Sequence, residues 1–197
     1  MKIIIKKKFN KMAPIAFLTC LMINQSAFAN EQDDVNSLAA PCAACHGLDG
    51  ISNNTNYPNL AGQKQGYLNQ EIKAFRDGKR DNPQMLPFVK SLSDEDIAKL
   101  SHYFSEQKNE TIASENYNKK GENVRARCVS CHGMTGITVT QLWPNLAGQQ
   151  AGYLQKQLHA FKSGERHSPL MQVIAQELTD EEIEAVSEYY SQQPANQ

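Results

Sequence analysis

Past its first 29 residues, the sequence lacks any apolar run that approaches the roughly 20 residues of a membrane-spanning helix. It also lacks an excess of basic residues. The first 29 residues hold five of the 20 Lys and Arg residues and none of the 21 Asp and Glu residues, so the remainder has a net charge of −6. This balance argues against nucleic-acid binding, which needs a basic face. It permits electrostatic steering towards basic partner surfaces, and solubility alone explains it equally well. The remainder is expected to be soluble or peripheral to a membrane.

Cysteine is scarce, and none is spare for a structural disulfide. One of the five, Cys20, lies in the N-terminal apolar segment, and the other four form two motifs 86 residues apart, Cys42-Ala43-Ala44-Cys45-His46 and Cys128-Val129-Ser130-Cys131-His132. Cys-x-x-Cys-His is typical of covalent c-type haem attachment. Two thiols one helical turn apart can reach the two vinyl groups of one porphyrin, and a proximal histidine is the usual first axial ligand of haem iron. The motifs therefore predict two covalently bound haem c groups.

Two other kinds of site use Cys-x-x-Cys. A redox dithiol of the thioredoxin type would need a βαβ pattern around the motif, and a zinc site would pair the motifs or add a close His-x-x-x-His. Neither pattern is visible in the sequence. Haem attachment is the favoured interpretation.

The N-terminus has the three parts of a secretory signal peptide. A basic stretch precedes the apolar segment Met12 to Ile23, and Ala27-Phe28-Ala29 forms a cleavage site. Cleavage is predicted after Ala29, and a retained anchor is the alternative. Cys20 would leave with this peptide, and the residues before it make a poor lipoprotein signal. No twin-arginine pair is present, so we expect export of the unfolded chain and later haem attachment.

The rest of the chain is a tandem duplication. A shift of 86 residues aligns positions 42–108 with 128–194 without a gap, with 29 identities in 67 positions. The expected domains are residues 30–112 and 113–197, joined by a polar linker from Lys108 to Lys120. Each unit has about 80 residues, which is small for a stable core, and a buried porphyrin would supply the missing apolar interior.

The repeats predict helices and no strands. The expected helices are Asp33 to Ala44, leading into the haem motif, Gly66 to Arg76, ended by Gly78, and a last helix that begins at Ser93. Thr179 to Glu182, the equivalent of the last start, forms a full capping box. The segment from Lys79 to Leu92 is expected to be a loop.

Two methionines are candidates for the second axial ligand. Met85 and Met171 each lie 39 residues after a motif histidine and two residues after a proline, in loops whose other residues differ between the repeats. A thioether in each loop would give His/Met coordination, which raises the reduction potential. Core filling is the alternative role of a methionine. Met134 is too close in sequence to His132 to reach the opposite face of that haem.

Further residues leave two roles open. Pro58 and Pro144 could accept a hydrogen bond from the motif histidines, or could only turn the chain. Tyr57 and Trp143 could bind a haem propionate or pack on the porphyrin edge. Arg80 and Arg166 could pair with propionates, and exposure at the surface is at least as well supported. His102, His159 and His167 have no histidine at the equivalent position of the other repeat and are expected to be solvated.

Together, the two motifs, the two Pro-Asn-Leu-Ala-Gly stretches, Met85 and Met171, and the acid-capped closing helices resemble the di-haem cytochrome c4 family. The resemblance implies an all-α protein of two tandem class I cytochrome c domains about a pseudo-twofold axis. It implies haem attachment at Cys42, Cys45, Cys128 and Cys131, with iron ligation by His46, Met85, His132 and Met171. It also implies a periplasmic carrier between quinol-oxidising complexes, such as the cytochrome bc1 complex, and terminal oxidases. Some members associate peripherally with the membrane.

The predicted function is one-electron transfer without catalysis. Iron with two firm axial ligands changes charge without changing ligands, as a carrier requires. The alternatives are a di-haem enzyme, either peroxidase-like or the cytochrome subunit of a dehydrogenase, and a gas sensor. A peroxidase needs an open iron position and a sensor needs a labile ligand, so the matched methionines argue against both.

Overall fold

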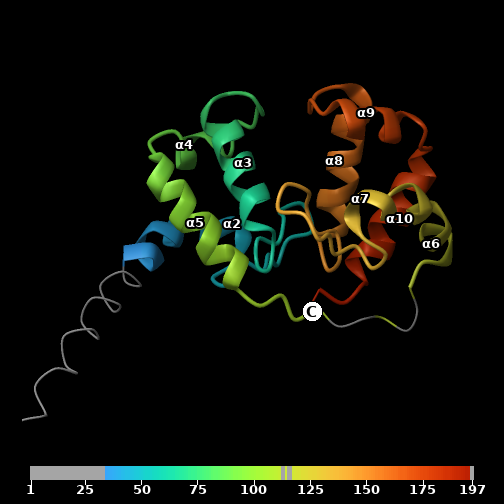
Figure 1. The fold of residues 1–197 in the computed structure, drawn as a ribbon, viewed down its shortest axis with the longest axis horizontal. Coiled ribbons are helices and arrows are strands. Elements are labelled where there is room, and N and C mark those ends of the chain that lie inside the picture. The colour runs from blue at the N-terminus through green and yellow to red at the C-terminus, as the bar shows by residue number, and fades with distance from the viewer. Residues whose placement is uncertain (1–33, 112–113, 115–116, 196–197) are drawn as a thin grey trace, which may run out of the picture. The chain divides into compact units, whose positions relative to one another are not determined.

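The computed structural model describes residues 34–111, 114 and 117–195. The predicted signal peptide and its cleavage site lie outside these residues. The described part of the chain contains helices, turns and loops but no strand, which confirms the all-α prediction (Figure 1). None of its helices combines the length and apolar character needed to cross a membrane.

The first lobe, residues 34–108, contains the first haem motif. Helical backbone over residues 34–39 leads into a 3-10 turn, Ala40–Cys42, and then into α2, Ala43–His46. Helices α3, Gln65–Arg76, and α5, Asp94–Glu106, pack against each other, and the short α4, Leu86–Val89, contacts α3. The expected helix into the motif is therefore present, with a 3-10 turn in the middle of it.

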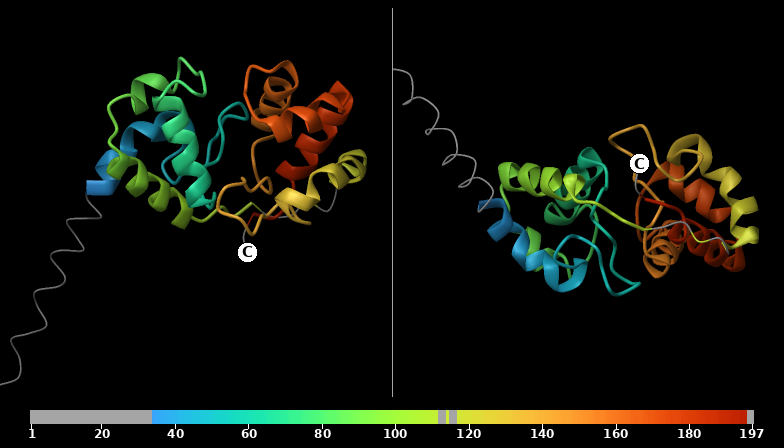
Figure 2. Two further views of the ribbon diagram at one scale, coloured as in Figure 1. Left: turned by 45° about the horizontal axis from the view of Figure 1, so that its top comes forward. Right: turned by 90° about the horizontal axis from the view of Figure 1, so that it is seen from below.

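The second lobe, residues 117–195, repeats this order. It begins with α6, Lys119–Val124, followed by a 3-10 turn at Arg125–Arg127 and by α7, Val129–His132, which holds the second motif. Helix α8, Ala151–Ser163, packs against α9, Pro169–Gln176, and against α10, Asp180–Ser191, while α10 also contacts α6. The two views of Figure 2 show the two lobes as separate groups of helices.

Each lobe has its own apolar core. In the first lobe the core is built from Ala39, Leu68, Leu100 and Phe104. In the second lobe it is larger and includes Val124, Leu154, Ile183, Val186, Tyr189 and Tyr190. Because the clusters share no residue, each lobe has the character of a small domain.

The prediction of a loop from Lys79 to Leu92 is wrong in one respect, because a short helix interrupts this segment. Helix α4 begins directly after Met85, and the equivalent α9 is longer, so Met171 lies in its first turn. Proline at the start of each helix explains this, because its fixed φ suits the first helical turn and its missing N–H is not needed there. Pro87 and Pro169 therefore lie in the first turns of helices.

Both closing helices begin with a complete capping box. Ser93 accepts a hydrogen bond from the Asp96 backbone while the Asp96 side chain accepts from the Ser93 backbone, and Thr179 and Glu182 do the same in α10. The sequence predicted the full box only for α10. The shorter carboxylate of Asp96 also closes it, so both helices start at fixed points.

Gly121 allows α6 to cross α10 closely. A Cβ atom at this position would lie 2.0 Å from the Ala185 carbonyl oxygen and 2.7 Å from Cβ of Tyr189. We expect Gly121→Ala to lower the free energy of unfolding by about 3 kcal/mol, because two backbones would have to separate. Urea denaturation of the haem-loaded protein followed by circular dichroism measures this. The exposed Asn123→Ala on the same helix is the control, with a change below about 0.5 kcal/mol. Equal stability of both variants would contradict the close crossing.

Candidate haem sites

The cysteines of each motif lie on a short helix with their thiols free. Cys42 caps α2 and Cys45 lies within it; Cys128 caps α7 and Cys131 lies within that helix. All four are partly buried and form no disulfide. Burial raises the pKa of the Cys42 and Cys128 thiols. A redox dithiol needs a lowered thiol pKa, so this environment does not favour the thioredoxin-like alternative.

The zinc alternative also finds no support in the geometry. Across the described ranges, 34–111 and 117–195 with residue 114, no three His, Cys, Asp or Glu side chains are grouped to hold a metal ion. The two motifs belong to different lobes, each with its own core. They therefore form two separate sites.

Each motif histidine is buried and held by a backbone carbonyl. Nδ1 of His46 lies 2.9 Å from the Pro58 oxygen, and Nδ1 of His132 lies 2.9 Å from the Pro144 oxygen. Burial lowers the pKa of both imidazoles more than these hydrogen bonds raise it, which favours the neutral form that ligates metals. A carbonyl on Nδ1 leaves Nε2 for iron, so one of the two roles considered for Pro58 and Pro144, hydrogen bonding to the histidines, is confirmed.

A glycine turns the chain away from each motif. Gly47 has φ +79° and Gly133 has φ +84°, which side chains rarely adopt. A Cβ atom at Gly47 would also lie 1.9 Å from the Ile51 carbonyl oxygen. This close return brings the loop with the Pro-Asn-Leu-Ala-Gly stretch back beside the motif.

Polar side chains fix that loop to the motif. Ser52 donates its hydroxyl to the Cys45 carbonyl at 2.8 Å, and the Ser52 N–H donates to the Asn59 side chain at 2.9 Å. Thr138 and Asn145 repeat both contacts in the second lobe. These four residues were not predicted from the sequence to take part in the site. The two Asn, identical in both Pro-Asn-Leu-Ala-Gly stretches, were the available signal.

The two candidate methionines have matching local frames. The backbone N–H of Met85 donates to the Asn82 side chain at 3.2 Å, and that of Met171 donates to the Ser168 hydroxyl at 3.4 Å. Asn82 and Ser168 are equivalent in the duplication, although neither was predicted from the sequence to take part in the site. Neither methionine is fully buried. Each is therefore held by a capped turn and keeps side-chain surface for a further contact.

Large apolar side chains beside both methionines remain exposed. Leu86 and Phe88 are 39% and 47% exposed, and Leu170 and Val173 are 68% and 58% exposed. Burying such surface is favourable, and a porphyrin supplies the apolar partner. Each lobe therefore has a neutral, buried imidazole and a pair of free thiols, with apolar side chains beside them. This combination fits one haem in each lobe.

Arg80 and Arg166 are buried, so the surface alternative is wrong. Their side chains are only 12% and 11% exposed, and both form an ion pair with Glu71. Arg166 does so from the other lobe, at 3.0 Å. Both arginines also donate hydrogen bonds to neutral side chains of the other lobe. Arg80 donates to the Tyr153 hydroxyl at 3.2 Å and to the Gln157 side-chain oxygen at 2.5 Å, and Arg166 donates to the Tyr67 hydroxyl at 3.0 Å. Burial raises the pKa of Tyr67 to about 12. With Tyr67 neutral, the two guanidinium groups share the Glu71 carboxylate.

The remaining candidate residues are the three unmatched histidines, Tyr57 and Trp143. His102, His159 and His167 are exposed, as expected. Tyr57 lies edge-on to His46 with ring centroids 6.5 Å apart, and Trp143 is 37% exposed. Tyr57 thus packs beside the ligand histidine candidate.

Comparison with known proteins agrees with the geometry. The family model described as cytochrome c matches the chain twice, at residues 34–108 and 119–193. Cytochrome c4 of Pseudomonas aeruginosa is 34% identical over 195 residues, covering 91% of this chain and 97% of the relative. A thiosulfate dehydrogenase electron acceptor of Stutzerimonas stutzeri is 33% identical over 201 residues, covering 90% and 93%. The crystal structure of reduced recombinant cytochrome c4 from Pseudomonas stutzeri superimposes with a TM-score of 0.75 at 31% identity, over 82% of this chain and 97% of that one.

The chain matches the cytochrome c family model twice and has two Cys-x-x-Cys-His motifs, and it covers nearly the full length of its relatives. This chain belongs to the di-haem cytochrome c4 family, and it is an electron-transfer protein, not an enzyme, that carries two covalently bound haem c groups.

Proposed function

We propose that this protein carries single electrons in the periplasm between a quinol-oxidising complex, such as a cytochrome bc1 complex, and a terminal oxidase. The secretory signal predicted at the N-terminus, with predicted cleavage after Ala29, supports the location. The net charge of −6 after that residue supports docking on basic partner surfaces, because complementary charge accelerates encounter. Peripheral association with the membrane is consistent with such partners.

We assign the iron ligands as His46 with Met85 and His132 with Met171, in domains of residues 30–112 and 113–197. The observation that carries the assignment is the matched local geometry of the two repeats. Each histidine has its Nδ1 bound to a proline carbonyl at 2.9 Å, and each methionine follows a capped turn. A bound haem would supply an iron that gains and loses one electron. The chain's own residues hold neutral imidazoles towards it and shield it with apolar side chains.

Carbon monoxide binding tests whether both irons are closed by two firm axial ligands. The purified haem-loaded protein is reduced with dithionite, and its absorption spectrum is compared before and after the gas is added. We expect no change, since two firm axial ligands leave no open position. A full spectral shift at either haem would instead support the alternative of an enzyme or sensor.

The respiratory position needs a separate measurement. Membranes that contain a quinol-oxidising complex are mixed with the oxidised protein and quinol, and haem reduction is followed by absorbance. We expect rapid reduction that an inhibitor of the complex abolishes. Failure of this reaction would remove the complex as the donor.

A second donor needs a parallel test, because two relatives bear the name thiosulfate dehydrogenase electron acceptor. Reduction by thiosulfate and a thiosulfate dehydrogenase, without membranes, would place this chain after that enzyme. Reduction by quinol and membranes alone would favour the respiratory position.

A further inference from the structure

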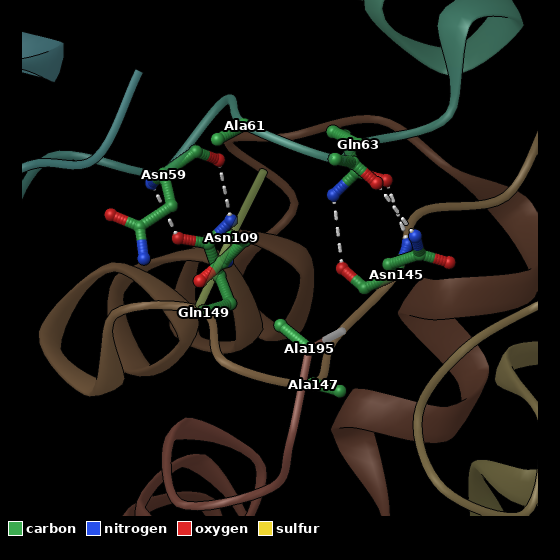
Figure 3. Close-up of a pocket in the computed structure, with 9 residues that line it drawn as sticks. Asn59, Ala61, Gln63, Asn109, Asn145, Ala147, Gln149 and Ala195 are labelled. Carbon is green, nitrogen blue, oxygen red and sulfur yellow. Dashed lines mark hydrogen bonds between the residues drawn. The ribbon is translucent and has the colours of Figure 1, made fainter. Parts of the chain in front are cut away.

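Two buried glutamines join the lobes in a reciprocal way. Gln63 and Gln149 are equivalent in the duplication, and these residues are 6% and 5% exposed. Oε1 of Gln149 accepts the Asn59 N–H at 2.7 Å, while its Nε2 donates to the Asn59 carbonyl at 2.9 Å. Gln63 makes the same two bonds to Asn145, at 2.7 and 3.0 Å (Figure 3). Each glutamine thus binds the backbone of the opposite lobe.

The N–H groups that the glutamines bind belong to the same peptides that hold the motif histidines. The N–H of Asn59 and the carbonyl of Pro58 are the two ends of one peptide group, and that carbonyl binds Nδ1 of His46. The peptide between Pro144 and Asn145 has the same relation to His132. A continuous path therefore runs from each imidazole, through one peptide, to the glutamine of the other lobe.

This path has an electronic consequence. A peptide whose N–H donates to an oxygen has a more negative carbonyl, and such bonds in series strengthen one another by about 10–30% in a buried, low-dielectric place. A stronger acceptor on Nδ1 makes the imidazole a more basic ligand. A more basic ligand stabilises the more positive, oxidised iron. The glutamine of one lobe would therefore lower the reduction potential of the haem in the other.

We propose that Gln149 tunes the haem of the first lobe and Gln63 tunes the haem of the second lobe, each through the peptide that positions the motif histidine. Both are positioning residues, because they act through another group. The proposal rests on the assignment of His46 and His132 as iron ligands. It gives the two domains a coupling that their separate cores would not provide.

The test is a pair of substitutions, Gln149→Met and Gln63→Met, in the haem-loaded protein. Each removes the acceptor oxygen and keeps similar volume. A redox titration followed by NMR reports each haem separately through its methyl resonances. We expect Gln149→Met to favour reduction of the first-lobe haem about two- to fourfold, which is about 18–36 mV at 59 mV per tenfold for one electron. Gln63→Met should shift the second-lobe haem by a similar amount.

Gln150→Met is the matched control. Gln150 also crosses between the lobes, donating to the Ser52 carbonyl at 2.7 Å and to the Asn59 side chain, but it does not bind the Asn59 N–H. If the glutamines only held the lobes together, all three variants would shift the potentials alike. A larger shift in the glutamine's own lobe, or no shift in either haem, would overturn the proposal.

A measurement on the unchanged protein covers the case in which the variants do not fold. In the reduced protein, NMR can detect scalar coupling across the hydrogen bond from the Asn59 nitrogen to the side-chain carbonyl carbon of Gln149. We expect this coupling, and its equivalent between Asn145 and Gln63. Its absence at both positions would break the path and overturn the proposal. Irons that stay closed to carbon monoxide while these tests fail would leave the proposed electron-carrier function intact.

Discussion

Replacing Met171 by alanine is expected to lower the reduction potential of the second haem and to let its reduced iron bind carbon monoxide. A thioether ligand raises the potential, and axial ligands set haem potentials over a range of about 0.8 V. We expect a fall on the order of 0.1–0.3 V from the loss of this ligand. Potentiometric titration and the carbon monoxide difference spectrum of the variant measure both effects. Met85→Ala should do the same to the first haem.

Met134 provides the control for this experiment. It is 67% exposed and lies two residues after His132, so Met134→Ala removes a thioether without opening an iron. We expect its potentials and its spectrum with carbon monoxide to match those of the unchanged protein. If Met171→Ala also left both unchanged, the second ligand would have to be another residue.

Replacing Glu71 by glutamine is expected to destabilise the protein by about 3–5 kcal/mol, because it leaves two buried arginines without their carboxylate. Arg80 and Arg166 come from different lobes, and both bind Glu71. The second repeat has Gln157 at the equivalent position, so the substitution makes the cluster symmetric in side chains but doubly positive. Urea denaturation of the haem-loaded protein gives the change in the free energy of unfolding.

The second repeat also offers a rescue. Gln157 already contacts both arginines, Arg80 at 2.5 Å and Arg166 at 2.9 Å. The double variant Glu71→Gln with Gln157→Glu moves the carboxylate across the pseudo-twofold, and we expect it to recover most of the lost stability. Glu95→Gln, which breaks an exposed pair with Lys99, is the control and should cost at most about 1 kcal/mol. A double variant as unstable as the single one would show that charge is not the cause.

The local features of this protein were predictable because their signals lie within a few residues. The cap and acidic first turn at Ser93 and Thr179 start helices by contacts three residues apart. The spacing within Cys-x-x-Cys-His is one helical turn. The same kind of reasoning mistook two segments, around Pro87 in the first lobe and around Pro169 in the second, for loops, since proline also favours the first turn of a helix.

The duplication also made it possible to predict pairs of equivalent residues, which local signals alone do not identify. Arg80 and Arg166 stood out because they match across the repeats, but matching could not say whether they were buried. Burial depends on the opposite lobe, which supplies Tyr153 and Gln157 to Arg80. A guanidinium that is solvated in an isolated domain becomes part of an interface when two domains meet.

The sequence by itself determined the fold class, the two haem attachment motifs, the duplication and the carbonyl candidates at Pro58 and Pro144. These follow from spacing and repetition, which a linear chain records directly. Only the tertiary structure decided that Gln149 binds Asn59 and that Glu71 serves two arginines. The Gln149 contact spans 90 residues, and no local preference of the backbone encodes it. Such pairs form because two lobes bury polar groups against each other, and each buried group must find a partner where the packing places one.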